Sequence, residues 1–384
     1  MIIKYLFSSP EGDISLGPED LKRPFLITPS KSHASLTLGD YFEALKAFVW
    51  GDGGERLFRV LGGSAPEVEE LDHIQEIWIR SEKHGVFYHV ASVEILFGDR
   101  TFKFAVSTAV TEEAKARLTN EYEILKFLDR SLRLPYLPKV YEKGDVPCQE
   151  GHNHHETLTL MLSEWFQGYH EWHLSIDEKD HCQKVCIWDF ENGHRYASEE
   201  EVLEIFRQAS EILTLYYDAR SFKQIYPWHH AAGDFVVKTG ASGTHVKLTT
   251  VRNYQSIMDF LSKDRVNPMT ALVYFFLNLT LKMRLDRLDG VGETAWAGDF
   301  AVGAATTGFF EGLSAMKKAG RFPHKTVNEV LTLFQSFSEQ EFERVFRSLF
   351  VLYQDDDPAD LSLLHTNLKN HITALSQALR TIYP

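Results

Sequence analysis

One segment in the second half of the chain carries residue types that can do chemistry at close spacing. It reads IYPWHHAAGDFVV and contains His229, His230 and Asp234. Imidazoles followed by a carboxylate suit a catalytic or ligand-binding loop. Two ordinary roles stay open, a histidine that bonds a loop carbonyl and an aspartate that caps the turn before the apolar run Phe235–Val237.

Histidines and cysteines gather in a second place, where residues 148–156 read CQEGHNHHE. Cysteine and histidine are the usual zinc ligands, so the loop from His152 to His155 is a candidate metal site, with His181, Cys182 and Cys186 as further ligands. Closed zinc sites usually present two clean pairs of ligands two to four residues apart, and neither pair is clean here. A solvated turn between two strands is the alternative.

The composition limits the classes of partner. The chain has 384 residues, 44% hydrophobic and 24% charged, as expected of a globular protein with a buried core. Its formal charge of −14 disfavours nucleic acid and anionic membranes as partners, because phosphate-rich surfaces attract basic proteins. The longest apolar stretch, Ala271–Leu281, is too short to cross a bilayer, and the N-terminus does not read as a secretory signal. Three cysteines do not make a disulfide framework, so we expect a cytoplasmic protein.

Strands dominate the first half after a mixed N-terminal extension. The extension, residues 1–70, contains one clear helix, Leu38–Trp50, which Thr37 caps. Three runs rich in Val, Ile, Phe and Tyr then predict an antiparallel meander over Ile74–Arg80, Val86–Phe97 and Thr101–Val110. A helix begins after Thr111, and two more strands follow, of which the second is Leu158–Trp165.

The second half is mostly helical. Ser198 caps a long helix predicted over Glu199–Arg220, and a hairpin follows over residues 235–251. The periodicity predicts a further helix over Ala271–Leu288, closed by Gly290, and two or three more after Thr326. The order of elements predicts an α+β protein.

This order of elements resembles the protein-kinase-like superfamily, nearest to the aminoglycoside and choline phosphotransferases, over roughly residues 74–320. In that family a segment after a long helix reads His-Gly-Asp-Leu-His-Pro-Gly-Asn and leads into a short strand. Aligning its end with Gly233–Val236 places Asp234 at the magnesium-binding Asn, His229 at the catalytic Asp and Pro227 at the first His.

The resemblance implies a two-lobed kinase-like fold that follows the N-terminal extension. A small lobe, residues 71–168, would hold an antiparallel sheet with one helix, and a large lobe, residues 169–384, would be mostly helical. ATP and magnesium are the implied cofactors, and a small molecule or a protein is the expected partner.

The large-lobe motifs depart from the family pattern. Aspartate can replace asparagine as a ligand of a hard cation, so Asp234 is a candidate metal ligand. Histidine at position 229 replaces the carboxylate that orients the acceptor hydroxyl. The strand after the hairpin should end in a metal-binding Asp, but residues 247–254 read KLTTVRNY, and the nearest acid is Asp259. Arg252 could contact phosphate directly or pair with one of the surplus acids.

The small-lobe motifs depart as well. Ser107 stands where the family has its phosphate-pairing Lys, and Lys103 is the only lysine on that strand and shares its face. Glu121 stands where a helix Glu would pair with that Lys, or it is an ordinary solvated residue. The loop Ser81–Gly85 holds a single glycine and is not a glycine-rich phosphate cradle.

Loops between large-lobe helices build the acceptor pocket in this family. In the segment Gly290–Asp299, which is rich in small residues, Glu293, Trp296 and Asp299 are therefore candidate substrate-binding residues. Close packing between helices is the alternative explanation for the small residues.

Three hypotheses follow from different classes of protein. The first is a pseudoenzyme or regulator that binds a nucleotide or small molecule in a degenerate kinase-like site. The second is an active but atypical phosphotransferase that uses Asp234 as metal ligand and His229 at the acceptor, with Lys103 or Arg252 on the phosphates. The third is a metal-binding or scaffolding protein whose chemistry lies in the loop from His152 to His155.

Overall fold

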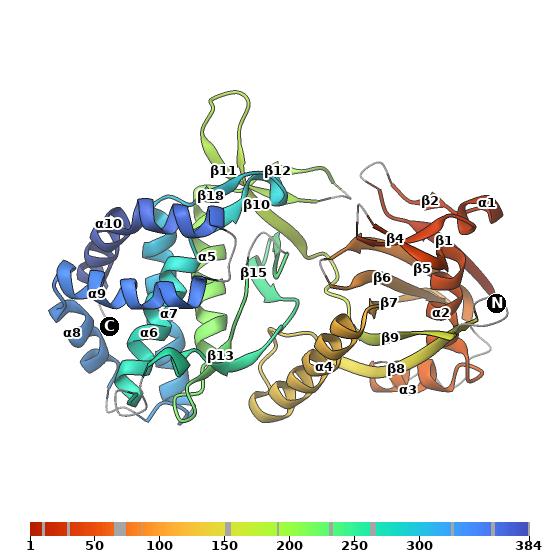
Figure 1. The fold of residues 1–384 in the computed structure, drawn as a ribbon, viewed down its shortest axis with the longest axis horizontal. Helices are drawn as coiled ribbons and strands as arrows, with labels where there is room; N and C mark the ends of the chain where they lie inside the picture. Colours follow the sequence, from red (N-terminus) through yellow and green to blue (C-terminus); the bar gives the residue numbers. More distant parts are fainter. Residues whose placement is uncertain are drawn as a thin grey trace. The chain divides into compact units, whose positions relative to one another are not determined.

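A computed structural model shows a chain of mixed helices and strands, which confirms the expected α+β class (Figure 1). The chain forms two compact units, residues 1–131 with 138–167 and residues 132–137 with 168–384. The structure describes residues 1–9, 12–28, 31–64, 74–85, 87–149, 155–189, 192–229, 233–261, 266–323, 326–354 and 358–382.

The first unit is built on a seven-stranded sheet of order β2-β1-β5-β6-β7-β9-β8. The antiparallel meander β5–β6–β7 confirms the prediction, with Arg80 opposite Ser92 and Glu94 opposite Lys103. β1 pairs in parallel with β5, so residues of the N-terminal segment complete this sheet. The strands are β1 (Ile2–Phe7), β2 (Ile14–Ser15), β5 (Ile74–His84), β6 (His89–Phe97), β7 (Arg100–Ala109), β8 (Val140–Gln149) and β9 (His155–Glu164).

Helix α2 (Leu38–Trp50) supplies much of the core of the first unit. It begins where predicted, because the Thr37 hydroxyl accepts from the Asp40 N–H and the Asp40 carboxylate accepts from the Thr37 N–H. Phe42 and Phe48 of α2 pack with Val106 of β7 in one buried cluster. The other elements of this unit are α1 (Pro18–Leu21), β3 (Pro24–Thr28), β4 (Lys31–Thr37), α3 (Glu55–Ser64) and α4 (Glu112–Leu132).

The second unit contains a five-stranded sheet of order β12-β11-β10-β14-β15. The predicted hairpin is confirmed as β14 and β15, in which Phe235 lies opposite Leu248. Two small ribbons pair β13 with β16 and β17 with β18. The strands are β10 (His170–Ile176), β11 (Gln183–Trp188), β12 (Arg195–Tyr196), β13 (Lys223–Ile225), β14 (Phe235–Gly240), β15 (Gly243–Leu248), β16 (Tyr254–Ser256), β17 (Leu285–Arg287) and β18 (Thr294–Trp296).

The second unit also contains six longer helices. α5 and α7 approach closely because Gly308 lies against the α5 backbone, where a Cβ would sit 2.0 Å from the carbonyl oxygen of Arg207. The helices are α5 (Glu199–Leu215), α6 (Pro268–Lys282), α7 (Asp299–Lys318), α8 (Val327–Ser336), α9 (Glu339–Leu349) and α10 (Pro358–Thr381). The last three confirm the helices predicted after Thr326.

Two predicted helix ends are wrong. α5 stops at Leu215 instead of Arg220, because the chain turns back and the Asp218 N–H donates to the Lys223 carbonyl at 2.8 Å. α6 stops at Lys282 instead of Leu288, because the residues after it form the β17–β18 ribbon. The apolar pattern continues through both ends, but the backbone there follows hydrogen bonds to residues a short way further along the chain.

Candidate functional site

Asp234 holds its own loop together. Its side chain is 1% exposed, and Oδ2 accepts a hydrogen bond from the backbone N–H of His229 at 2.7 Å. The two terminal nitrogens of Arg252 bind the two carboxylate oxygens, Nη1 to Oδ2 and Nη2 to Oδ1. The backbone carbonyl of Asp234 accepts from the Thr249 N–H at 2.7 Å. The residue therefore closes the loop between β13 and β14, which is the turn-capping role left open above.

Arg252 neutralises the carboxylate that the sequence assigned to a metal. A paired guanidinium and carboxylate make two parallel charge-assisted hydrogen bonds, the strong form of this interaction. Arg252 belongs to the segment after β15, where the family pattern has an acid. Of the two roles predicted for Arg252, the structure has the ion pair.

The end of this loop lies against strand β10. Gly233 has a φ of +67°, and a Cβ there would sit 2.7 Å from the carboxyl carbon of Glu171. A side chain at position 233 would therefore meet both an unfavourable backbone conformation and the Glu171 carboxylate. Glu171 in turn lies near His173 on the same strand, with 3.8 Å between Oε2 and Nε2.

His173 is a buried cation between two acids. It is 1% exposed, and its Nδ1 lies 3.4 Å from Oδ1 of Asp286, whose other oxygen accepts from the Leu174 N–H at 2.8 Å. Burial alone would lower the pKa of His173, but hydrogen bonds and charge from Asp286 and Glu171 outweigh it and raise the pKa to about 9. His173 is therefore protonated at neutral pH and fastens β10 to β17.

His229 meets a carboxylate at the start of α10. Its Nε2 lies 3.5 Å from Oδ2 of Asp360, which is 5% exposed. Thr294 of β18 donates to the other oxygen of Asp360 at 3.2 Å. Burial would raise the pKa of Asp360, but the hydrogen bond and charge of His229, the charge of Lys282 and the Thr294 hydroxyl together lower it. Asp360 thus links the predicted catalytic loop to the predicted substrate segment.

The three predicted substrate-binding residues separate into two groups. Trp296 and Asp299 share Arg284, whose Cζ lies 4.7 Å from the Trp296 ring centre and whose Nη2 donates to Asp299 at 2.9 Å. Glu293 is exposed, and its side chain is not part of this arrangement in the described residues.

The predicted residues of the first unit lie on the half-exposed face of the sheet and on α4. Lys103 and Ser107 share a face of β7, as expected, because Phe104 and Val106 between them point into the core. Lys103 Nζ lies 3.4 Å from a Glu82 oxygen and 4.1 Å from the Trp165 ring centre.

Glu121 on α4 is 3% exposed and is therefore buried, not solvated. Arg80, on the same face of the sheet as Lys103, is held by both oxygens of Asp13 at 2.7 and 2.6 Å. Lys103 and Arg80 are thus both already paired with acids.

Only some of the candidate metal ligands lie among the described residues. His152–His154 lie outside the described residues, as does His230. His181 and Cys182 are exposed, Cys186 is buried, and burial raises the pKa of the Cys186 thiol. Within the described ranges, no group of three or more His, Cys, Asp and Glu side chains is arranged to hold a metal ion.

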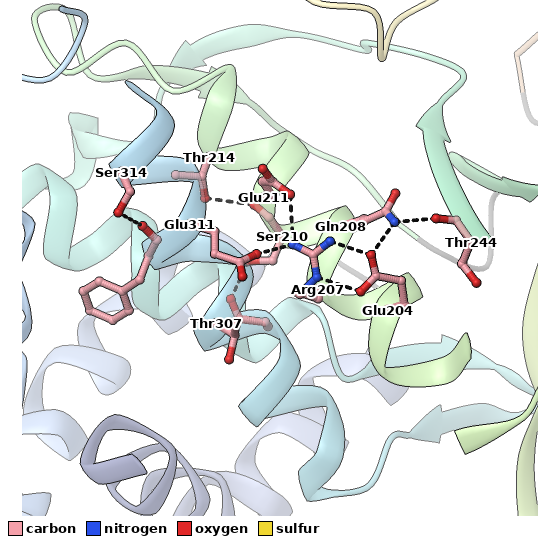
Figure 2. A network of polar contacts seen from close by, with 12 residues as sticks. Glu204, Arg207, Gln208, Ser210, Glu211, Thr214, Thr244, Thr307, Glu311 and Ser314 are labelled. Carbon is pink, nitrogen blue, oxygen red and sulfur yellow. Dashed lines mark hydrogen bonds and ion pairs between the residues drawn. The ribbon is translucent and has the colours of Figure 1, made fainter. Parts of the chain in front are cut away.

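A further polar network joins α5 to α7 and β15 (Figure 2). Arg207 binds Glu204, Glu211 and Glu311, and Gln208 donates to the Thr244 carbonyl at 2.6 Å. Burial, together with the charges of the neighbouring glutamates, raises the pKa of Glu211. A surface depression of about 390 Å³ beside this network is lined by nine residues, among them Glu211, Glu311, Lys318 and Phe310. The network fastens two helices and touches none of the residues predicted from sequence.

Sequence reasoning missed the acids that complete the loop region. Glu171 and His173 alternate on a strand that reads HEWHLSI, which gives a weak signal of a polar strand face. Asp286 lies 113 residues from His173, and Asp360 opens a helix near the C-terminus. No local spacing reveals pairs this distant in a single sequence.

Comparisons with known proteins give little overlap. No protein-family model matches the sequence. A stretch of 124 residues is 27% identical to the sodium-dependent nutrient amino acid transporter 1 of Drosophila erecta and covers 29% of this chain and 19% of the transporter. The chain thus spans about a fifth of the length of that curated relative. In the part of the chain that the structure describes, no helix is both long and apolar enough to cross a bilayer.

A crystal structure of Rad53 residues 1–466 in complex with AMP-PNP aligns with 80% of this chain and 61% of its own chain. The sequence identity is 13% and the TM-score is 0.33. A TM-score this low does not establish a shared fold. The function proposed below therefore rests on the contacts of the residues described above.

Proposed function

We propose that this chain has a kinase-like fold with a degenerate phosphotransfer site. In this proposal it acts as a pseudoenzyme or regulator that binds a nucleotide or other small molecule without transferring phosphate. The observation that carries the proposal is the pairing of Arg252 with both oxygens of Asp234.

A magnesium ion at Asp234 would have to displace that guanidinium. Removing one partner from a buried ion pair costs on the order of 3 kcal/mol, which corresponds to roughly a hundredfold in affinity. The ion would also have to compete with the His229 N–H, which donates to the same carboxylate. The residue best placed by sequence to bind a metal is therefore occupied by protein groups.

The first unit supports the same reading. Phosphate groups need unneutralised cations, and Lys103 is paired with Glu82 while Arg80 is paired with Asp13. Ser107, at the position of the expected lysine, supplies a neutral hydroxyl. The order of elements supports the kinase-like fold, since the β5–β6–β7 meander precedes α4 and the Asp234 loop precedes the β14–β15 hairpin.

A transfer assay tests the proposal. The full chain is incubated with ATP, Mg²⁺ and a panel of hydroxyl and amine acceptors, and ADP is quantified. We expect the same background rate for the wild type and for Asp234→Ala. Glu343→Ala is a matched control, because it breaks the exposed pair between Glu343 and Arg347 on α9. ADP formation that is lost in Asp234→Ala and kept in Glu343→Ala contradicts the proposal.

One observation favours a second candidate, an active but atypical phosphotransferase. A carboxylate beside an imidazole, as in Asp360 and His229, orients the ring, which suits a general base at an acceptor hydroxyl. This candidate predicts turnover that falls at least tenfold in Asp360→Asn. Absence of turnover in the wild type removes it.

A further inference from the structure

Buried polar atoms gather where α6, the β17–β18 ribbon and α10 meet. Arg284 is 4% exposed and His371 is 0% exposed. Three buried atoms, Nη1 of Arg284, Nε1 of Trp296 and Nδ1 of His371, have no hydrogen-bond partner among the described residues. Buried polar atoms in folded proteins are nearly always satisfied, so each of the three needs a partner.

The three side chains share one environment. The Arg284 Cζ lies 4.7 Å from the Trp296 ring centre, and the ring centres of Trp296 and His371 are 6.2 Å apart. Arg284 is also close enough to His371 for its charge to act with burial in lowering the pKa of that histidine well below its ordinary value. His371 is therefore neutral at pH 7 and carries one ring proton.

The neighbouring hydroxyl fixes which nitrogen carries that proton. Thr280 Oγ1 donates to the Leu277 carbonyl at 3.2 Å and lies 3.5 Å from His371 Nε2. With its one hydrogen on the Leu277 carbonyl, the shorter of the two contacts, the Thr280 hydroxyl serves as the acceptor for His371. The ring proton is then on Nε2, and Nδ1 presents a lone pair that needs a donor.

We propose that one buried water molecule lies among these side chains, accepting from Arg284 Nη1–H and donating to His371 Nδ1. Two hydrogen bonds of about 2.9 Å let a single water join polar atoms up to roughly 5.5 Å apart. The Trp296 indole N–H supplies a second donor, which gives the water the three contacts typical of a buried site. A small anion such as chloride fits less well, because it cannot donate to the lone pair of His371.

The water would complete the attachment of the β17–β18 ribbon to α10. The start of β18 already meets α10 through the bond from Thr294 to Asp360. The water at Trp296 and His371 fastens its other end. Because Trp296 and Asp299 were predicted to bind substrate, the water would also hold that segment in place, although this inference does not depend on the proposed function.

The ¹⁵N chemical shifts of the histidine rings in the full chain test the proton assignment. We expect His371 to be neutral at pH 7 with its proton on Nε2. Its signals are identified by their disappearance in His371→Phe or, if that variant does not fold, by the shift they undergo in Thr280→Val. A proton on Nδ1, or on both nitrogens, overturns the proposal.

A water-to-protein nuclear Overhauser experiment tests the water itself. The Trp296 indole proton, assigned with Trp296→Phe, should show a cross-peak to a long-lived water. The Trp78 indole is the internal control, because it donates to Glu76 at 2.6 Å and needs no water. No water cross-peak at Trp296 overturns the proposal, and so does an anomalous bromide peak at this site in crystals soaked in sodium bromide.

Discussion

Arg252 and Asp234 form a two-point ion pair in which each terminal nitrogen of the guanidinium meets one oxygen of the carboxylate. The carboxylate is 1% exposed and also accepts from the His229 N–H. The pair therefore anchors the loop between β13 and β14 to the segment after β15. The carboxylate that was predicted from the sequence to bind magnesium is thus part of a structural contact.

The first prediction concerns the strength of this pair. Asp234→Ala should lower the free energy of unfolding by about 2–3 kcal/mol, because it leaves a partly buried guanidinium and the His229 N–H without their acceptor. Arg252→Ala should have a similar effect, and the double variant should show a coupling of about 1–3 kcal/mol. Urea unfolding of the four proteins measures these values.

Arg252→Lys is the matched control for geometry, because an ammonium cannot make two parallel bonds to one carboxylate. The Arg252→Lys variant should therefore be less stable than the wild type. Additive effects of the two alanine variants, with no coupling, would show that the pair does not hold the loop.

The second prediction concerns the close approach of Gly233 to Glu171. Gly233→Ala should lower the free energy of unfolding by about 1–2 kcal/mol, chiefly through the positive φ and further because the Glu171 carboxylate must shift from its place beside His173. Gly240→Ala is the control, since nothing lies within 4 Å of a Cβ there. Glu171→Ala should restore part of the loss in the Gly233 variant, and equal losses at positions 233 and 240 would contradict this account.

Sequence patterns were sufficient for elements whose signals are local. The cap at Thr37 and the meander from Ile74 to Ala109 depend on neighbouring residues or on strict alternation, and both were predicted. The ends of α5 and α6 were not, because there the backbone follows pairing with residues several positions away along the chain. Apolar residues suit a helix and a buried ribbon equally well.

The third prediction is a stability loss at alkaline pH from His173. Its pKa is raised from 6.5 to about 9, so its contribution is fully present below pH 6.5 and disappears as the pH rises through 9. The loss between these values should be about 3 kcal/mol. Urea unfolding from pH 6 to 10 measures it, with Asp286→Asn as the comparison. If Asp286→Asn lost stability with pH as the wild type does, Asp286 would not be a cause of the raised pKa of His173.

The fourth prediction is a stability loss at acidic pH from His89. Burial, together with the nearby His84, lowers the pKa of His89 to about 3, so the folded chain resists a proton that the unfolded chain takes up below pH 6.5. The ring centres of these two histidines are 4.0 Å apart, and the ring centres of Phe25 and His89 are 4.3 Å apart.

Stability should therefore fall by up to about 1.4 kcal/mol per pH unit below 6.5 because of this residue. Amide hydrogen exchange in β5 and β6 between pH 7 and 5 measures the effect. The fall of stability with decreasing pH should be less steep in His89→Phe than in the wild type. An equally steep fall would show that His89 takes up its proton in the folded state.

The candidate site was predictable only where the chemistry lies in one short segment. His229 and Asp234 were found because they lie only five positions apart in an unusual stretch. Their partners Asp360 and Arg252 come from other elements, and the fold alone brings them together. Arg252 was considered as a phosphate ligand or an ion-pair partner, and choosing between these roles required the position of Asp234.

The central claim is most directly tested by the melting temperature of the full chain titrated with ATP, with and without Mg²⁺. A ligand that binds only the folded state stabilises it by about 2.7 kcal/mol at one hundred times its Kd. This stabilisation raises the melting temperature. We predict a rise with ATP that is the same with and without Mg²⁺, because Arg252 occupies the carboxylate of Asp234. A rise that requires Mg²⁺, or no rise at millimolar ATP, would contradict a nucleotide-binding site that has lost its metal.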